Sequence, residues 1–381
     1  MPHKSEKIIP FNRSSILGRE LEYIADTVCA GQVSGDQQYS KRCQILLNSI
    51  IGVKSSLLTT SCTHALEMCA LLLNIGPGDE VIVPSFTFVS TANAFALRGA
   101  RIVFCDIRPD TLNMDEKLLA TLITSRTKVI VPVHYAGVGC DMDAILAIAG
   151  RHGIPVVEDN AHGLFGKYRG KWLGTFGSMA TQSFHETKNI TCGEGGALLL
   201  NSESLIDRAE IIREKGTNRS KFFRGMVDKY SWVDIGSSYV MSDVLAAFLY
   251  AQLENWEKVQ LNRKRIWGLY NAALKDWALR SGVGQPIVPA ECEQAYHMYY
   301  LLFPNLQART AMISHLKQKD IHAVFHYLPL HLSPTGRTFG GQPGMCPVTE
   351  SISDRLVRLP FYNTLSEVEQ LRVINAITKF N

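Results

Sequence analysis

The chain has 381 residues, which allows one large α/β domain plus a smaller one and a full core without disulfides or metals. A hydrophobic fraction of 46% and a charged fraction of 19% exclude a disordered chain. The net charge is +4, from 39 basic and 35 acidic residues, and the basic residues are scattered, which argues against a dedicated nucleic-acid binder.

The ends and the cysteines indicate the compartment. The polar N-terminus lacks the apolar stretch of a signal peptide, and no apolar run of 18 residues predicts a membrane span. The nine cysteines are an odd number without a C-x-x-C pair. This usage predicts reduced thiols in a cytoplasmic protein, with no disulfide framework and no zinc site.

Short β-branched runs alternate with amphipathic helical stretches between residues 55 and 200. The predicted strands are EVIVP (80–84), RIVFCDI (101–107), KVIVPVHY (128–135), IPVVED (154–159) and GALLL (196–200). The predicted crossover helices are 63–73, 90–98, 115–123 and 141–152, with Asp115 and Asp141 as N-caps and Gly153 as a C-terminal stop. Strands that are apolar on both faces predict a doubly wound, mostly parallel sheet.

The pattern changes after Met241. Residues 243–277 lack proline and contain one glycine, Gly268, so they predict a long helix with at most one break. A smaller α+β unit then contains expected strands near 299–303 and 322–327. Its last helix opens with the capping box Ser366-x-x-Glu369, and the expected buried face is Val368, Leu371, Ile374 and Ile377. We therefore predict two domains, residues 1–242 and 243–381.

Common phosphate and metal motifs are absent. The sequence has no G-x-x-x-x-G-K-[ST] and no G-x-G-x-x-G after a strand, and HETKN (185–189) lacks the second histidine of a zinc-protease motif. The eleven histidines form no group with ligand spacing, so no metal site is predicted.

Two acids end a predicted strand. Glu158 and Asp159 follow an apolar run, which in an open α/β sheet places them at the ligand crevice beside the strands' carboxyl ends. An acidic cap of the following turn explains them equally well. Lys188 lies 29 positions after Asp159, before the glycine-rich CGEGG (192–196). A loop lysine by itself is usually just solvated.

Together the acid and the lysine suggest pyridoxal phosphate. This cofactor needs a lysine for covalent attachment and an acid against its ring nitrogen. Its phosphate needs hydroxyl and N–H donors, which Ser61, Cys62 and Thr63 at a predicted helix start can provide. Ser183 offers another hydroxyl, and Phe86 or Phe88 an aromatic cover for the ring.

Four longer segments resemble a known family. PSFTFVSTANA (84–94), PVHYAG (132–137), VVEDNAHG (156–163) and SFHETKN (183–189) are similar to the DegT/DnrJ/EryC1/StrS aminotransferases of nucleotide sugars. The resemblance runs from IIPFNRSS (8–15) to the final helix. It implies the fold-type I pyridoxal-phosphate architecture of aspartate aminotransferase and a homodimer with shared active sites.

The resemblance also assigns residues to the cofactor. Lys188 matches the lysine that binds the cofactor and moves protons, and Asp159 the partner of the ring nitrogen. His162 matches the contact to the phenolic oxygen, and Phe88 the stacked aromatic. The matched phosphate contacts are Cys62, Thr63, Ser183 and, from the partner subunit's loop 235–243, Ser238. Ser61 opens the same phosphate-binding turn.

The residues expected to bind the substrate come from less specific similarities to the family. The expected contacts of the sugar nucleotide are Phe86, Arg219, Arg224, His326, Tyr327 and His331. For the histidines and Tyr327 a structural role is equally open, and exposed arginines are more often only solvated.

The predicted activity is transamination of a nucleotide-linked keto sugar. Segment 213–243 is most similar to family members that act at C4 of a dTDP-linked 4-keto-6-deoxyhexose. Glutamate would convert the cofactor to its pyridoxamine form and leave as 2-oxoglutarate, for surface-glycan biosynthesis. The alternatives are action at C3, a UDP- or GDP-sugar, a non-catalytic cofactor-binding regulator, and a lyase or dehydratase.

Overall fold

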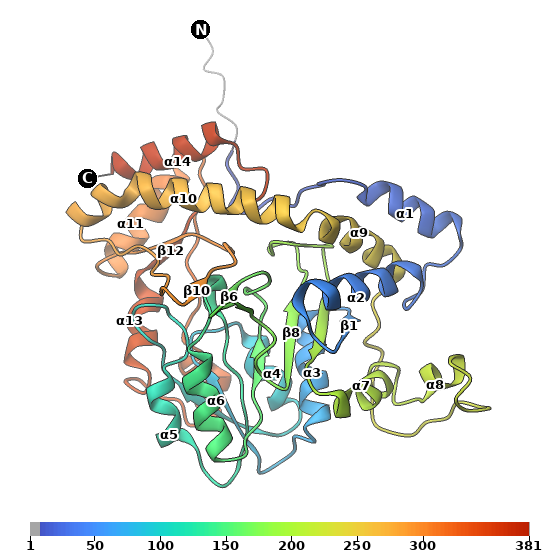
Figure 1. Cartoon of the computed structure of the whole chain (residues 1–381). Helices are drawn as coiled ribbons and strands as arrows, with labels where there is room; N and C mark the ends of the chain where they lie inside the picture. Colours follow the sequence, from blue (N-terminus) through green and yellow to red (C-terminus); the bar gives the residue numbers. More distant parts are fainter. Residues whose placement is uncertain (1–7, 381) are drawn as a thin grey trace.

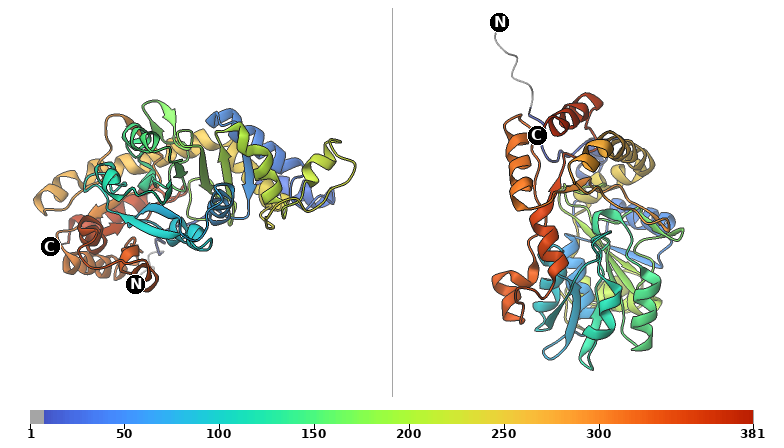
Figure 2. Two further views of the ribbon diagram at one scale, coloured as in Figure 1. Left: turned by 90° about the horizontal axis from the view of Figure 1, so that it is seen from below. Right: turned by 90° about the vertical axis from the view of Figure 1, so that its left-hand side faces the viewer.

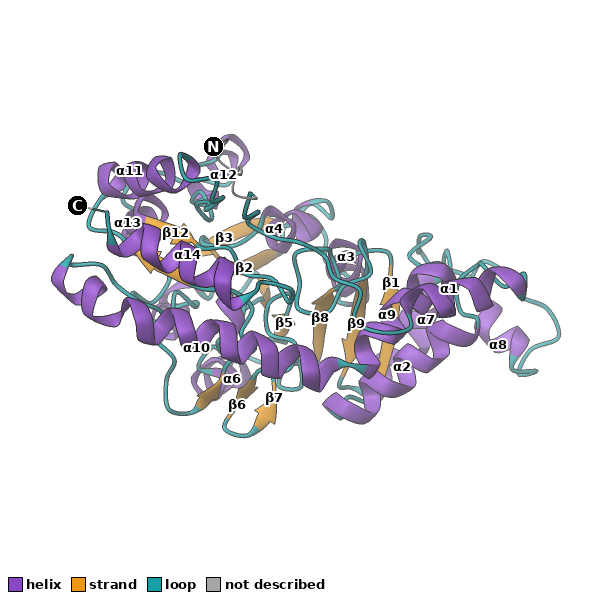
Figure 3. Cartoon of the chain, turned by 90° about the horizontal axis from the view of Figure 1, so that it is seen from above, coloured by secondary structure: helices purple, strands orange, loops and turns teal. Residues whose placement is uncertain are grey.

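A seven-stranded mixed sheet forms the centre of the computed structural model, which describes residues 8–380. Its strand order is β1-β9-β8-β5-β4-β2-β3, because parallel bridges from Ile130 to Val156 and from Val133 to Asp159 join two smaller sheets (Figure 3). Only β9 runs antiparallel to its neighbours. The strands are β1 (Ser55–Thr59), β2 (Glu80–Pro84), β3 (Arg101–Cys105), β4 (Thr127–Ile130), β5 (Val157–Asp159), β8 (Met179–Ser183) and β9 (Gly196–Leu200). The mostly parallel α/β sheet is confirmed.

Helices cover both faces of this sheet (Figure 1). Successive strand residues point to opposite faces, so Leu198 packs in one core cluster and Leu199 in another. One face is covered by α3 (Cys62–Leu72), α4 (Val89–Ala96) and α7 (Ile206–Arg213). The other is covered by α1 (Glu20–Cys29), α2 (Gln38–Ile51), α5 (Leu119–Leu122), α6 (Met142–Arg151) and α9 (Asp243–Glu254).

The predicted helix boundaries are confirmed at their caps. The Asp115 carboxylate accepts a hydrogen bond from the Lys117 N–H at 3.1 Å, and Asp141 accepts one from the Ala144 N–H at 3.1 Å. Gly153 ends the α6 region with a φ of 65°, a left-handed conformation that favours glycine.

A second core lies beside the sheet, where α10 runs along α14 (Figures 1 and 2). The predicted long helix has one break, which the structure places at Asn255, so that α9 packs with α1 and α2 while α10 enters the second core. Its elements are α10 (Trp256–Arg280), α11 (Leu306–Lys317), α13 (Pro347–Arg355), α14 (Glu367–Thr378), β11 (Tyr300–Leu302) and β12 (Leu356–Arg358). The division into domains at residue 243 stays a proposal.

Two expectations for the smaller unit are wrong. Residues 322–327 form no strand and make only a single bridge, from Val324 to Arg358. In α14, Val368 is 79% exposed and Leu371 41% exposed, whereas Ile374 and Ile377 are buried as expected. The buried face contains Gln370 and Val373 instead, and the Gln370 side chain donates a 2.6 Å hydrogen bond to the Ile266 carbonyl.

The remaining elements are short. A small antiparallel sheet contains β6 (Lys167–Tyr168), β7 (Lys171–Trp172) and β10 (Cys292–Glu293). Two further short helices are α8 (Arg219–Phe223), which projects from one end of the molecule, and α12 (Pro334–Thr338) (Figures 1 and 3). Within residues 8–380 no helix is both long and apolar enough to cross a membrane.

Candidate active site

A small pocket lies past the carboxyl ends of β5 and β8. Lys188 reaches it from the loop between β8 and β9, where the Lys188 N–H donates to the His185 carbonyl at 2.9 Å. The lining residues are Ala161, His162, Leu164, Gln182, Ser183, Lys188, Asn189, Ile190 and His297. The sequence analysis predicted three of them, His162, Ser183 and Lys188, as site residues.

Asp159 is buried and held by two donors. The Thr91 hydroxyl donates to Oδ2 at 2.7 Å, and the Ala161 N–H donates to Oδ1 at 3.1 Å. Burial raises the pKa of Asp159, while these two hydrogen bonds and the nearby Lys188 oppose the rise. One carboxylate oxygen therefore caps the following turn, and the same side chain is electrostatically coupled to Lys188.

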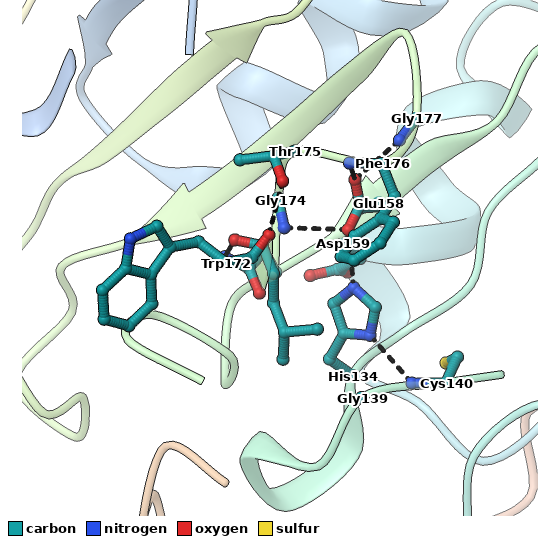
Figure 4. Close-up of polar contacts among 12 residues, drawn as sticks. His134, Gly139, Cys140, Glu158, Asp159, Trp172, Gly174, Thr175, Phe176 and Gly177 are labelled. Atoms are coloured by element: carbon teal, nitrogen blue, oxygen red, sulfur yellow. Dashed lines mark hydrogen bonds and ion pairs between the residues drawn. The ribbon is translucent and has the colours of Figure 1, made fainter. Parts of the chain in front are cut away.

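Glu158 has a separate, structural role (Figure 4). Its carboxylate accepts hydrogen bonds from the N–H groups of Gly174, Phe176 and Gly177 at 2.8, 2.7 and 2.8 Å. His134 Nε2 lies 2.9 Å from the same carboxylate, and the Cys140 N–H donates to His134 Nδ1. The imidazole proton is therefore assigned to Nε2. This network anchors the end of β5, which leaves Asp159 as the acid of the site.

Lys188 has an unusual protonation equilibrium. The pKa of its amine is lowered to about 8, mainly by burial; Cys62 and Asp159 oppose this shift, and the positive charge of Arg358 adds a smaller lowering. An ordinary solvated lysine has a pKa near 10.4. Lys188 can therefore supply an uncharged, nucleophilic amine near neutral pH.

Two stacked imidazoles form one wall of the pocket. The rings of His162 and His297 lie 4.3 Å apart with an interplanar angle of 17°. His297 Nδ1 donates to the Asn189 side-chain oxygen at 3.0 Å. His162 Nδ1 is buried without a partner in the described chain, and Nε2 is 3.4 Å from the Tyr327 hydroxyl. Burial lowers the pKa of both imidazoles, which keeps them neutral.

The start of α3 supplies a second group of donors. The Ser61 side chain accepts from the His64 N–H at 3.1 Å, and the Thr63 hydroxyl donates to Ser90 at 2.8 Å. Cys62 is coupled electrostatically to Asp159 and Lys188, and burial raises the pKa of its thiol. A Cβ at Gly196 would lie 2.4 Å from the Cys62 nitrogen, so only glycine lets β9 approach this helix start.

Comparison with known proteins decides the family. The chain matches the DegT/DnrJ/EryC1/StrS aminotransferase family over residues 15–378. It belongs to that family. It is 33% identical over 388 residues to the spore coat polysaccharide biosynthesis protein SpsC of Bacillus subtilis, covering 99% of this chain and 98% of SpsC. It is 34% identical to the uncharacterized protein MJ1066 of Methanocaldococcus jannaschii, covering 98% of each.

A solved structure supports this family assignment. The pyridoxal-phosphate form of the putative sugar aminotransferase Spr1654 from Streptococcus pneumoniae superimposes with a TM-score of 0.90, at 26% identity and 98% coverage of both chains. The same protein is also known in its pyridoxamine form, with a TM-score of 0.90. This chain is thus a pyridoxal-phosphate-dependent sugar aminotransferase of fold type I.

The pocket of this chain fits the cofactor. A buried amine with a lowered pKa, a buried acid and a buried imidazole nitrogen without a partner lie in one region. Thr181 adds a buried hydroxyl that lies beside the Cys62 thiol and has no hydrogen bond to an oxygen or nitrogen atom within residues 8–380. Such orphaned polar atoms cost free energy in an empty site and become satisfied when a polar ligand binds.

Some of the predicted residues lie apart from this pocket. Phe86 is buried against Tyr135 and Tyr327, and His331 is fully buried between Ser85 and Glu350, at 2.6 and 2.9 Å. Neither residue lines the pocket, and their predicted contacts with the substrate stay proposals.

Three other predicted residues are exposed in segment 213–243. Arg219 lies over the Phe223 ring and Arg224 forms an ion pair with Glu210, both on or beside the projecting α8. Ser238 is exposed too and bridges to Glu214. A single chain does not bring these residues to Lys188.

The three remaining predicted aromatics, His326, Tyr327 and Phe88, lie beside His162 or next to one another. The His326 ring is buried, with Nδ1 2.8 Å from the Tyr135 hydroxyl. Phe88 is 57% exposed at the start of α4, and its ring centroid lies 6.3 Å from that of Tyr327. Tyr327 therefore connects Phe88 to His162.

Sequence reasoning missed several partners. Thr91 lies in the first turn of α4, within the segment PSFTFVSTANA (84–94) that resembles the family, and that segment could have indicated it. His134 lies in the segment PVHYAG (132–137), but nothing in that segment indicated its contact with Glu158, and His297 carried no sequence signal because it reaches the pocket from a distant element. Their contacts depend on the tertiary structure alone.

Proposed function

We propose that the enzyme transfers an amino group from glutamate to C4 of a dTDP-linked 4-keto-6-deoxyhexose, giving the galacto product, dTDP-4-amino-4,6-dideoxygalactose. The coupling of the Lys188 amine to the buried Asp159 carries the transamination part of the proposal. The similarity of segment 213–243 supports the sugar nucleotide. A role in surface-glycan biosynthesis agrees with the name of the relative SpsC.

We assign the cofactor contacts to particular residues. When bound, pyridoxal phosphate supplies an aldehyde that carries the amino group and a ring that accepts electrons. Lys188 would bind it covalently and afterwards hold or deliver a proton at its Nζ. Asp159, as a carboxylate, would pair with the ring nitrogen, and His162 Nδ1 would contact the phenolic oxygen. Phe88 would cover the ring.

The phosphate contacts come from hydroxyls and N–H groups. The start of α3 (Ser61, Cys62 and Thr63) and Ser183 provide them within one chain. The positive end of the helix dipole at Ser61 favours an anion there.

We propose a homodimer in which Ser238 completes the partner's phosphate site. Segment 213–243 exposes apolar side chains that a stable monomer rarely leaves in water, with Trp232 78% and Phe223 69% exposed. In such a dimer Arg219 and Arg224 would reach the diphosphate of a substrate held by the partner. The nine cysteines, without C-x-x-C pairs, support a cytoplasmic enzyme.

One experiment tests the reaction and its alternatives. The holoenzyme is incubated with dTDP-4-keto-6-deoxyglucose and glutamate, and the product is analysed by NMR. We expect an axial amino group at C4 and one equivalent of 2-oxoglutarate. An equatorial product, amination at C3 or turnover only with UDP- or GDP-sugars would contradict the assignment. Deoxygenation without amination would indicate a dehydratase, and no turnover with any keto sugar a regulator.

A further inference from the structure

His297 contacts both loops that carry the reactive groups of the pocket. It lies in the extended link between β10 and β11, and its side chain lines the pocket together with His162 and Lys188. Its ring stacks on that of His162, with centroids 4.3 Å apart and 17° between the planes. Its Nδ1 lies 3.0 Å from the side-chain oxygen of Asn189, the residue that follows Lys188. One buried side chain therefore links the loop of His162 to the loop of Lys188.

The hydrogen bonds of Asn189 determine which nitrogen of His297 carries the proton. The Asn189 amide donates from Nδ2 to the Ala295 carbonyl at 2.6 Å and to Gln260 Oε1 at 3.3 Å. Because both of these partners are acceptors, the side-chain oxygen of Asn189 faces His297 and accepts. Burial lowers the pKa of His297, so its ring is neutral. The imidazole proton is therefore assigned to Nδ1.

The backbone before His297 has an uncommon conformation. Tyr296 has a φ of 51°, a left-handed value that an aromatic residue rarely adopts. The buried Arg263 of α10 holds this turn, because its Nε donates to the Tyr296 carbonyl at 2.8 Å and its Nη2 to the His297 carbonyl at 2.6 Å. On the other side the Ala295 N–H donates to the Gly137 carbonyl at 2.8 Å. Backbone strain of this kind persists where surrounding contacts enforce it, and it is concentrated at functional sites.

Arg263 also reaches the loop of Lys188. Its Nη1 donates to the side-chain oxygen of Asn363 at 3.0 Å, and Asn363 Nδ2 donates to the main-chain carbonyl of Asn189 at 3.3 Å. Burial lowers the pKa of Arg263 to about 9. A buried cation is costly unless its hydrogen bonds are made, and these bonds lead to the two groups beside Lys188. Asn189 is thus held at its main chain through Asn363 and at its side chain by His297.

His134 shows how a structural histidine of this fold differs from His297. Its Nε2 lies 2.9 Å from the Glu158 carboxylate and its Nδ1 accepts from the Cys140 N–H, so both nitrogens are satisfied by the protein. It does not line the pocket. The ring of His297, in contrast, packs on His162, whose buried Nδ1 has no partner within the described chain.

We propose that His297 is a positioning residue for amino transfer. The face of its ring sets the plane of the His162 imidazole, and its Nδ1–H sets the Asn189 side chain and thereby the loop of Lys188. The inference rests on the proposed function at one point, the contact of His162 Nδ1 with the phenolic oxygen of the cofactor. Small rotations matter, because a hydrogen bond weakens steeply as its angle closes and a shift of about 1 Å in a reacting group costs about a hundredfold in rate.

Two substitutions separate these tasks. His297→Phe keeps a flat ring on His162 but removes the N–H, whereas His297→Asn keeps an N–H near the position of Nδ1 but removes the ring. Pyridoxine 5′-phosphate has the phenol but no aldehyde, so its dissociation constant on cofactor-free protein, measured by tryptophan fluorescence, reports the ring contact. We expect His297→Asn to weaken this binding about tenfold and His297→Phe to leave it within threefold of wild type. The exposed His322→Asn is the matched control and should change nothing.

The rate at which pyridoxal phosphate becomes attached to Lys188 reports the position of the loop. Borohydride trapping at timed intervals and peptide mass spectrometry measure it. His297→Phe should slow the attachment about tenfold, because the side-chain oxygen of Asn189 loses its donor, whereas His297→Asn should stay within threefold of wild type. Neither measurement needs an amino donor or a sugar nucleotide, so a wrong substrate in the proposed function would leave both results unchanged.

A double-mutant cycle shows whether His297 acts through His162. In a His162→Ala background, His297→Asn should change the affinity for pyridoxine 5′-phosphate by less than twofold. An equal loss with and without His162 would overturn the inference. If His162→Ala itself keeps the wild-type affinity, the proposed phenolic contact is wrong, and the attachment rate of His297→Phe then decides the role of His297.

Two patterns across the His297 variants would also overturn the inference. One is affinity and attachment rate within twofold of wild type in both variants. The other is a loss of both quantities in both variants, which a merely structural role predicts. Each variant tests one task by itself, so the result for one stands even where the melting temperature shows that the other is unfolded.

Discussion

The pocket around Lys188 and the segment 213–243 are built in opposite ways. In the pocket, Asp159 is buried and fixed by two hydrogen bonds. In the segment, Ser238 and the arginines of the α8 region are exposed, and large apolar side chains such as Trp232 face solvent. This difference indicates that a single chain brings Lys188 and Asp159 together, whereas segment 213–243 leaves large apolar side chains exposed. The predictions below test each half of that comparison.

The largest effect is expected at Lys188. Lys188→Ala removes both the covalent attachment and the group that moves the proton, so turnover should fall by several orders of magnitude. Borohydride reduction of the wild-type holoenzyme should attach the cofactor to the peptide that contains Lys188. Lys41→Ala, on the exposed surface of α2, is the control and should keep full activity. Labelling of a different lysine would end this assignment.

Asp159→Asn tests the role of the Asp159 carboxylate in the reaction. The change keeps the shape but removes the charge, at a cost of roughly 2–4 kcal/mol or about 30- to 1000-fold in kcat. Stopped-flow absorbance of the half-reactions measures it. Asp143→Asn changes an exposed acid on α6 and should have no effect. If Asp159→Asn stayed within twofold of wild type, Asp159 would be only a cap of the turn.

Gly236→Trp tests the exposed segment. A Cβ at Gly236 would lie 2.4 Å from the Gly216 nitrogen and the Ile212 carbonyl oxygen, so a large side chain must displace this loop. We expect the variant to lose most activity although Lys188 is intact.

Mixing this variant with Lys188→Ala should restore part of the activity, because a mixed dimer holds one intact site. Each protein alone is the control. Absence of rescue in dimers shown by mass spectrometry to have exchanged subunits would refute shared sites, as would a monomer that still turns over.

The reactivity of Lys188 should depend on pH. With a pKa of about 8, its amine is uncharged above that pH, so acylation of the cofactor-free protein should slow by about tenfold for each pH unit below about 8. Peptide mass spectrometry follows the modification of Lys188. Protein unfolded in urea serves as the control, where the midpoint should rise toward 10.4.

The lowered pKa of Lys188 also makes the free energy of unfolding depend on pH. Between pH 8 and about 10.4 the unfolded chain binds more protons at Lys188 than the folded chain, so this group makes the folded protein more stable as the pH rises through that window.

The smallest effect is expected at Ser238. A neutral hydroxyl contributes about 1 kcal/mol to a phosphate contact, so Ser238→Ala should weaken cofactor affinity several-fold. Titration of cofactor-free protein with pyridoxal phosphate measures this. Ser204→Ala, outside the segment, is the matched control. An unchanged affinity in a proven dimer would remove Ser238 from the phosphate site.

The sequence alone predicts the alternating elements, the caps at Asp115 and Asp141 and a long helix with at most one break, because these depend on local periodicity and on side chains a few residues apart. The position of that break, Asn255, comes from the structure. Lys188 and Asp159 are candidates from the sequence because the strand ends and loops of an α/β sheet meet at one edge. The sequence does not predict the burial of Gln370, because its partner, the Ile266 carbonyl, lies on the distant helix α10.

Only the tertiary structure distinguishes the roles of the two adjacent acids and shows which distant residue completes the wall of the pocket. Glu158 and Asp159 look alike in sequence, but three N–H groups and His134 surround one of them, while Thr91 and Lys188 lie beside the other. His297 lines the pocket from a segment more than 100 residues beyond Lys188 in the chain. Its place depends on packing between distant elements, and no local pattern encodes a contact of that kind.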